Sequence, residues 1–97
     1  MNQERNKYPY FLFYEDWYNY IKELDDMMDQ ITLYSAIAHY GLYEIEPSDN
    51  FLPPAIMGYF NQVIRPNIDY QHAKYKAQQH SKERRKARKA NAKISNN

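Results

Sequence analysis

The chain has 97 residues and no cysteine, and its 11 tyrosines and four phenylalanines make it rich in aromatic side chains. The absence of cysteine excludes a disulfide framework, a thiolate zinc site and a cysteine nucleophile. The two glycines are too few for a glycine-rich phosphate-binding loop. This length favours one domain with a small core. Because self-association would add buried surface, we expect a homodimer or larger assembly through the first two predicted helices.

Charge is divided unevenly along the chain. Residues 1–69 contain 4 Lys/Arg and 11 Asp/Glu, for a net charge of −7, whereas residues 70–97 contain 9 and 1, for a net charge of +8. The formal net charge of +1 therefore conceals two opposite poles. A basic tail attracts polyanions and can contact phosphates, while the acidic part contains the apolar residues needed to fold.

No segment reads as a membrane anchor. The longest stretches without Asp, Glu, Lys or Arg, residues 30–43 and 50–64, are shorter than the roughly 20 apolar residues that a spanning helix needs. The charges at Glu4 and Lys7 and the proline at Pro9 argue against a signal-peptide core. We expect a soluble, cytoplasmic protein with no membrane partner.

The first predicted helix covers residues 14–24. Phe13, Trp17, Ile21 and Leu24 recur every three or four residues, and this spacing places them on one helical face. Two acidic residues fall in its first turn, where the helix dipole favours negative charge.

A second helix is expected to begin at a cap formed by Asp25 or Asp26 and to end at Gly41. Two apolar stripes run along it, one made by Met27, Ile31, Tyr34 and Ala38 and one by Leu33, Ile37 and Tyr40. Apolar residues on two sides predict burial on both sides, as in the central helix of a small bundle.

A loop is expected over residues 44–53. Pro54 then suits the first position of a third helix. Apolar residues from Ile56 to Ile68 then continue one helical face through Pro66. Because proline lacks a backbone donor and crowds the carbonyl four residues earlier, a kink or short break is expected near Arg65.

The apolar periodicity disappears beyond Tyr75. Residues 76–93 are mainly Ala, Gln, Lys and Arg, which have high helix propensity but offer no face to bury. The segment is either a helical extension or disordered until bound. The predicted fold is all-α: a three-helix body, residues 1–75, whose kinked last helix runs into a basic extension, residues 76–97.

Several spaced blocks of sequence carry a family resemblance. They are Phe11-Leu12-Phe13-Tyr14, Ile21-Lys22-Glu23-Leu24, Leu33-Tyr34, Ala36-Ile37, and Ile64-Arg65-Pro66 with Ile68-Asp69. In this order they resemble a family of uncharacterised proteins encoded by phages, prophages and gut bacteria, with an Ile-(Lys/Arg)-Pro-x-Ile-Asp signature. The resemblance covers roughly residues 11–75 and implies a gene of a mobile element, but it brings no activity.

The residues that could carry chemistry are sparse. Ser35 and His39 lie four residues apart on the second helix, but local spacing supplies no acid to orient the imidazole. Two pairs of possible metal ligands are Asp69 with His72 and His80 with Glu83. Their 11-residue offset separates the pairs by about 16 Å on one helix, so they cannot share an ion. We predict no enzyme activity, no metal and no cofactor.

The basic tail predicts contact with nucleic acid. The residues expected to contact phosphates are Lys82, Arg84, Arg85, Lys86, Arg88, Lys89 and Lys93. Cations on all sides of a helix, with no aromatic or amide stripe among them, suit the backbone of DNA or RNA better than base edges. We therefore predict a non-enzymatic accessory protein of a phage or mobile element that binds DNA or RNA through this tail, with Lys74 and Tyr75 at its base.

Two other interpretations remain open. The tail can serve only to solubilise the chain, or it can fold back on the acidic body at Asp25, Asp26 and Asp29. Alternatively, the chain is an interaction module that oligomerises, or docks on a phage or host protein, through an aromatic face. The expected interface residues are then Tyr10, Trp17, Tyr18 and Tyr59, because large aromatic side chains dominate protein interfaces.

Overall fold

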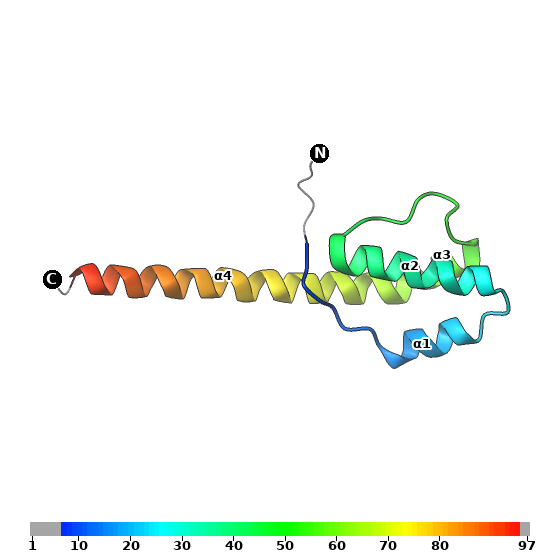
Figure 1. Cartoon of the computed structure of the whole chain (residues 1–97), viewed down its shortest axis with the longest axis horizontal. Coiled ribbons are helices and arrows are strands. Elements are labelled where there is room, and N and C mark those ends of the chain that lie inside the picture. Colours follow the sequence, from blue (N-terminus) through cyan, green and yellow to red (C-terminus); the bar gives the residue numbers. More distant parts are fainter. Residues whose placement is uncertain (1–6, 96–97) are drawn as a thin grey trace.

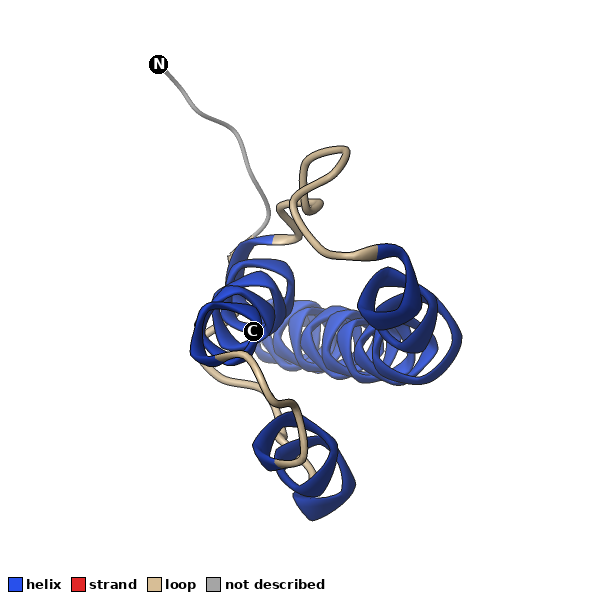
Figure 2. Cartoon of the chain, turned by 90° about the vertical axis from the view of Figure 1, so that its right-hand side faces the viewer, coloured by secondary structure: helices blue, strands red, loops and turns tan. Residues whose placement is uncertain are grey.

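The structure, a computed structural model, describes residues 7–95 of the chain and the side chains of residues 7–88. The helices are α1 (Glu15–Lys22), α2 (Met27–Tyr43), α3 (Pro54–Tyr59) and α4 (Arg65–Ser95), with a π-helical turn, η1 (Phe60–Ile64), between the last two. The described part contains no strand (Figure 2). Because α3, η1 and α4 follow one another without a loop, the chain has three helical stretches, and the predicted all-α fold is confirmed.

The three stretches pack side by side at one end of an elongated molecule (Figure 1). Helix α1 runs opposite to α2, and the loop of residues 44–53 returns along α2, so that α3 and α4 run in the same direction as α2. Helix α4 then continues alone, and the molecule extends over 68 × 33 × 18 Å. Among the described helices, none is long and apolar enough to cross a membrane.

The core lies where the three helical stretches meet. Its fully buried side chains are Trp17, Phe60, Ile21, Leu33, Ile37, Ile64 and Ile68. Burial of each such side chain contributes about 1.5–3 kcal/mol relative to exposure. His72 is the last buried residue of α4 among the described side chains, so the core ends about one quarter of the way along this helix.

Helix α1 is shorter than the predicted span of 14–24. It begins with Glu15 and Asp16 in its first turn, as expected, but ends at Lys22. The Leu24 N–H donates to the Ile21 carbonyl in a final turn, at 3.0 Å, and the chain then extends toward the cap of α2.

Helix α2 begins at the predicted cap but does not end at Gly41. The Asp26 carboxylate accepts a hydrogen bond from the Met28 N–H at 2.8 Å, which confirms the cap. At the other end the helix continues to Tyr43, and Glu44 rather than a glycine adopts the left-handed conformation, with φ 56°. The Glu44 N–H donates to the Tyr40 carbonyl at 3.0 Å and closes the helix.

Gly41 serves close packing instead of helix termination. A Cβ atom built at Gly41 would lie 2.5 Å from two ring atoms of Phe11, a distance that real Cβ contacts do not reach. The glycine therefore lets the segment before α1 pass directly against α2. The expectation of a helix end at this position is wrong because the residue is required for space, not for a positive φ.

Only one of the two apolar stripes of α2 is buried. Leu33 and Ile37 are fully buried, whereas Met27 and Ile31 are 71% and 53% exposed. Helices α1, α3 and α4 all pack against the Leu33 side, as the shared core cluster shows, and no further element of the described chain covers the other. The prediction of burial on both sides is therefore wrong for the first stripe.

The backbone near Pro66 departs from α-helical geometry without breaking. In η1 the Arg65 N–H bonds to the carbonyl of Phe60, five residues earlier, just before the proline. A π turn widens the helix and relieves the crowding between the proline ring and the preceding carbonyls. Of the expected kink or short break, a break does not occur, since helical backbone continues from Pro54 to Ser95, but the departure from α-helical geometry lies directly before Arg65.

Candidate nucleic-acid interface

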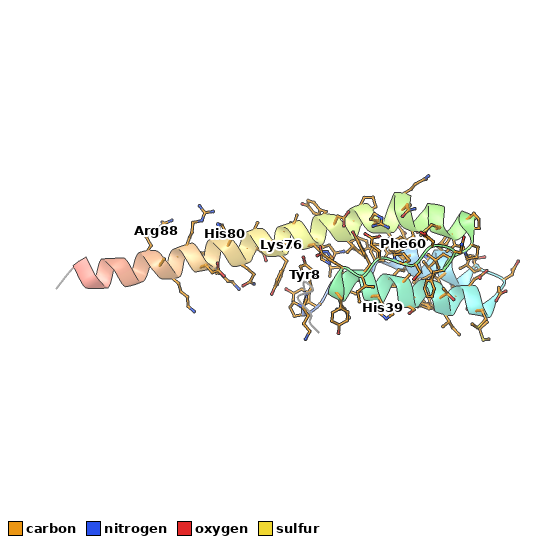
Figure 3. The ribbon with its side chains drawn as sticks, turned by 90° about the horizontal axis from the view of Figure 1, so that it is seen from above. Tyr8, His39, Phe60, Lys76, His80 and Arg88 are labelled. Atoms are coloured by element: carbon orange, nitrogen blue, oxygen red, sulfur yellow. The ribbon has the colours of Figure 1, made fainter. Side chains whose placement is uncertain are left out.

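The part of α4 beyond the body, residues 80–95, is here called the basic arm. Its described cationic side chains are all exposed: Lys82, Arg84, Arg85, Lys86 and Arg88. Lys89 and Lys93 stand on helical backbone, but their side chains lie outside the described residues. Figures 1 and 3 show the arm as a single helix leading away from the body, with the Arg88 side chain standing off its surface.

Cations occupy more than one side of the basic arm. Residues three or four positions apart are neighbours on a helix, so Lys82 lies beside Arg85 and Lys86, while Arg84 lies beside Arg88 on another side. Alanine and long straight side chains, which have high helix propensity, make up most of the arm and account for its helical backbone. The arm therefore presents positive charge to a partner from several directions.

The basic arm is not neutralised by the acidic body. In the part of the chain with described side chains, the ion pairs are Arg65 with Glu46, and His72 and Lys76 with Glu44, and none involves the arm. The arm also extends away from the turn between α1 and α2, where Asp25 and Asp26 lie (Figure 1). The alternative in which the tail folds back on this acidic turn is not the arrangement in the structure.

The N-terminal segment, residues 7–12, crosses α4 next to the basic arm. The Tyr8 N–H donates to the Leu42 carbonyl at 2.8 Å. The Gln71 side-chain amide accepts from the Leu12 N–H at 2.7 Å and donates to the Leu12 carbonyl at 3.1 Å. The Tyr8 ring stacks on His72 with centroids 3.8 Å apart and 5° between the planes. These contacts fix the segment at both ends.

A polar cluster, here called the junction, ties this segment to α2 and α4. The Tyr8 hydroxyl donates to the Glu44 carboxylate at 3.3 Å, and the Lys76 ammonium lies 3.9 Å from the same carboxylate. His72 Nε2 lies 2.8 Å from the Gly41 carbonyl, which can only accept, so Nε2 carries a proton. Its Nδ1 lies 3.2 Å from Glu44, within ion-pair distance but without hydrogen-bond geometry.

The junction alters the acidity of two of its groups. Burial, more than any other influence, raises the pKa of the Tyr8 hydroxyl above its usual 10.0. The pKa of Lys76 is also raised, first by its hydrogen bond with Tyr8 and then by the charge of Glu44. Both groups therefore hold their protons at neutral pH, and Lys76 adds a positive charge at the base of the basic arm.

Two shallow hollows flank the N-terminal segment where it crosses α4. The first, of about 250 Å³, is lined by Lys7, Tyr8, Tyr75, Lys76, Gln79, His80 and Glu83. The second, of about 180 Å³, is lined by Tyr8, Tyr10, Leu12, Gln71, His72, Lys74, Tyr75 and Gln78. Figure 3 shows Tyr8, Lys76 and His80 in this region, from which the arm continues to Arg88.

A second polar cluster pins the loop of residues 44–53 to the start of α4. Both terminal nitrogens of Arg65 lie 2.7 Å from the oxygens of Glu46, a forked ion pair. The Tyr40 hydroxyl donates to the Asp69 carboxylate. Burial, and secondarily this hydrogen bond, raises the pKa of Tyr40 from 10.0 to about 12.

The expected interface residues have different environments. Tyr10 and Tyr18 are exposed, whereas Tyr59 is half-buried and stacks on Tyr20, with centroids 3.6 Å apart. Trp17 is only 1% exposed and belongs to the core, where Phe13 packs edge-on against it. The structure thus assigns Trp17 to packing, and an interface role for the three tyrosines stays a prediction.

An exposed apolar stripe lies on α2, one of the two helices through which assembly is expected, but its residues are not among the expected interface residues. It consists of Met27, Ile31 and Tyr34, and Phe13 stacks on Tyr34 at 6.0 Å between centroids. We call these four residues the α2 stripe. Its periodicity is visible in the sequence, but only the packing of α1 and α4 decides which side of α2 is left open.

The residues considered for catalysis or metal binding do not form such a site. His39 is exposed, and no hydrogen bond joins it to Ser35 among the described contacts. Asp69 accepts from Tyr40, and His72 is buried in the junction. The described residues contain no group of three or more His, Asp or Glu side chains able to hold a metal ion.

The junction and the hollows were missed by sequence reasoning. Their aromatic residues come from the chain start and from α4, some 60 residues apart, and no local pattern links Tyr8 to His72. The only signal in the sequence is the aromatic content near the N-terminus, which does not indicate where those rings pack.

Comparison with known proteins identifies a family but no characterised relative. A model described as "Family of unknown function (DUF6291)" matches residues 10–94. No curated protein matches the chain, and no solved structure matches it. The match extends past the expected residues 11–75 and includes most of the basic arm. Since it covers most of the sequence, the chain belongs to this family of unknown function.

Proposed function

We propose that the protein is a non-enzymatic nucleic-acid-binding accessory protein whose basic arm contacts the phosphate backbone of DNA or RNA. The observation that carries the proposal is a set of solvent-exposed cations on one projecting helix: Lys82, Arg84, Arg85, Lys86 and Arg88. No acidic side chain of the described body forms an ion pair with them. Unpaired cations on a projecting helix can approach phosphates without first breaking ion pairs. The phage or mobile-element setting enters the proposal only from the sequence resemblance, and the cytoplasmic location only from the reading of the sequence as having no membrane anchor or signal peptide.

The expected binding is weakly selective for sequence. Lysine and arginine on several sides of the arm suit phosphates, and the arm offers no amide or aromatic stripe that would read base edges. Binding energy then comes mainly from the release of counterions, and unrelated sequences should bind with similar affinity.

The proposal is tested by two matched variants of the arm. The neutralised variant has Gln in place of Lys82, Arg84, Arg85 and Arg88. The charge-conserving variant has Arg in place of Lys82 and Lys in place of the same three arginines. Neutralisation should weaken binding to unrelated oligonucleotides by similar, large factors, while the charge-conserving variant should bind nearly as the parent does. Full affinity of the neutralised variant in a fluorescence-anisotropy titration would contradict the proposal.

A second candidate function is self-association or docking through the α2 stripe. Exposure of Met27 and Ile31 at 71% and 53%, beside two aromatic rings, is the observation that favours it. In that case the basic arm serves solubility, and its neutralisation leaves the oligomeric state unchanged. The two functions are compatible, because the α2 stripe and the arm lie in separate parts of the molecule.

A further inference from the structure

The basic arm itself contains no Tyr, Phe or Trp, but the fold places such rings at its base. Tyr8 and Tyr10 come from the N-terminal segment, and Tyr70 and Tyr75 come from α4. Figure 3 shows Tyr8 beside α4 where the arm leaves the body, near Lys76, with His80 farther along the helix. The sequence places Tyr75 between Lys74 and Lys76 at this base, and the fold adds Tyr8 and Tyr10 from the other end of the chain.

Tyr10 is exposed on an anchored segment. Its side chain is 68% exposed, yet the neighbouring Tyr8 is held by Leu42 and His72, and Leu12 is held by Gln71. The core does not need the Tyr10 ring, since most of its surface is open to solvent. An open ring on an anchored backbone is available to stack with a flat partner without ordering of the segment that carries it.

The hollow beside Tyr10 combines this ring with polar groups. It is also lined by Lys74, Tyr75 and Gln78, and its volume of about 180 Å³ is below the roughly 300–1,000 Å³ of typical small-molecule sites. The hollow therefore suits one flat group of a longer ligand better than a complete free ligand.

Ammonium groups already lie beside the rings of this region. The Lys74 Nζ is 5.6 Å from the centroid of Tyr70, and the Lys76 Nζ is 6.0 Å from that of Tyr8. Aromatic faces next to a positively charged track are the combination with which proteins hold single-stranded nucleic acid. The basic arm supplies the track, and it begins at His80, two residues after Gln78.

We propose that the hollow formed by Tyr10, Lys74, Tyr75 and Gln78 binds one unstacked base of a single-stranded nucleic acid whose backbone continues along the basic arm. The base stacks on Tyr10, and Lys74 contacts the adjoining phosphate. A duplex keeps its bases stacked inside and can use the arm alone, so the hollow confers a preference for single strands. This inference rests on the proposed function and adds the class of nucleic acid to it.

The test uses the full chain and three labelled probes of about 20 units: oligo(dT), oligo(U) and a DNA duplex of mixed sequence. Tyr10→Ala should weaken binding of the single strands by about 5- to 100-fold, in line with the loss of one base stack, and leave duplex binding unchanged. Tyr10→Phe keeps the ring and should retain the affinity. Tyr18→Ala, which removes another exposed ring on α1 away from the arm, is the matched control. The two single-stranded probes separate DNA from RNA as the ligand.

Lys74→Gln provides a second variant that does not depend on the ring. It should weaken single-strand binding and make its log–log salt slope shallower by about 0.7, the loss of one phosphate contact. Equal effects of Tyr10→Ala on single strands and duplex, or no effect on either, would overturn the hollow as a base site. The proposed function would survive that result if neutralising the arm still abolished binding. Failure of the parent chain to bind any probe would overturn both.

Discussion

Gly41 and Phe11 show how a single missing side chain positions a whole segment. The Phe11 ring occupies the place where a Cβ at Gly41 would lie, at 2.5 Å, and this contact brings the N-terminal segment close to α2. The same segment then continues to Leu12, which Gln71 of α4 holds. Loss of this close approach should loosen the connection between the chain start and α4.

Substitution of the two glycines by alanine should have opposite effects. Gly41→Ala should destabilise the chain by about 1–2 kcal/mol, because overpacking of about 1–3 kcal/mol exceeds the gain in helix propensity. Gly58→Ala is the control: a Cβ at this position in α3 would meet nothing within 4 Å, so stability should rise by about 0.5–1 kcal/mol. Urea denaturation measures both, and a Gly41→Ala chain as stable as Gly58→Ala would contradict the packing role.

The raised pKa of Tyr40 predicts that the folded chain loses stability in alkali. Its pKa is about 12 in the folded chain against 10.0 in the unfolded chain, so the protonated hydroxyl is favoured by folding. The associated stability is fully present below pH 10 and is lost as the pH rises toward 12, because the unfolded chain releases its proton first.

The matched variant is Tyr40→Phe, which lacks both the hydroxyl and its titration. The stability advantage of the parent over this variant should be largest near neutral pH and should shrink as the pH rises above 10. Urea denaturation of both chains at a series of pH values measures the difference, in which the other tyrosines cancel. An advantage that stays constant up to pH 12 would refute the assigned role of the Tyr40 to Asp69 hydrogen bond.

The two faces of α2 have different roles. Leu33 and Ile37 belong to the core, whereas Met27 and Ile31 remain exposed beside Phe13 and Tyr34. Isoleucine occurs on both faces, so replacement by alanine at each position compares a buried and an exposed site on the same helix.

Ile37→Ala should destabilise the chain by about 2–5 kcal/mol, because Ile37 is fully buried and its truncation leaves a cavity. Ile31→Ala should cost less than about 1 kcal/mol in the same urea experiment, because its side chain is 53% exposed. Similar losses for the two variants would show that the α2 stripe is buried in solution, for example against a second copy.

Local chemistry predicts some elements of this fold and fails at others for identifiable reasons. The Asp26 cap and the start of α3 at Pro54 depend on neighbouring residues, and the sequence predicts both. The close packing of Gly41 against Phe11, some 30 residues earlier, is not visible in a local pattern. Pro66 does indicate where the last helix departs from α-helical geometry, but not that the departure is a π turn.

The same distinction applies to the candidate site. The charges of the basic arm and the absence of a face to bury can be read directly from the sequence, which leaves open whether the segment is helical or disordered. The stacking of Tyr8 on His72 and the position of Tyr10 at the base of the arm cannot, because they arise when residues 7–12 cross α4. The sequence therefore predicts a phosphate-binding segment, and the fold adds the aromatic group beside it.

In the molecule as a whole, the acidic body and the basic arm are separated along the long axis (Figure 1). The α2 stripe lies on the body, so self-association through it would leave the arm free. A symmetric dimer of this kind would present two arms to one polymer and raise the effective affinity without a new contact.

Self-association through the α2 stripe predicts a species larger than the 11.8 kDa chain in sedimentation at micromolar concentration. Ile31→Asp should shift the population to the monomer, because it places a charge in the centre of an apolar interface. Val63→Asp, at a position 41% exposed outside the stripe, is the control and should leave the larger species in place. A parent chain that sediments only as a monomer would exclude this association.

The salt dependence of nucleic-acid binding is the sharpest test of the proposed function. If four to six cations of the basic arm contact phosphates, the log–log slope of affinity against salt should be about −3 to −5. The variant with Gln at Lys82, Arg84, Arg85 and Arg88 should have a slope shallower by about 3, because each lost contact removes about 0.7–0.9. A slope near zero for the parent, or no detectable binding at about 50 mM salt, where phosphate contacts are strong, would contradict a phosphate-binding role for the arm.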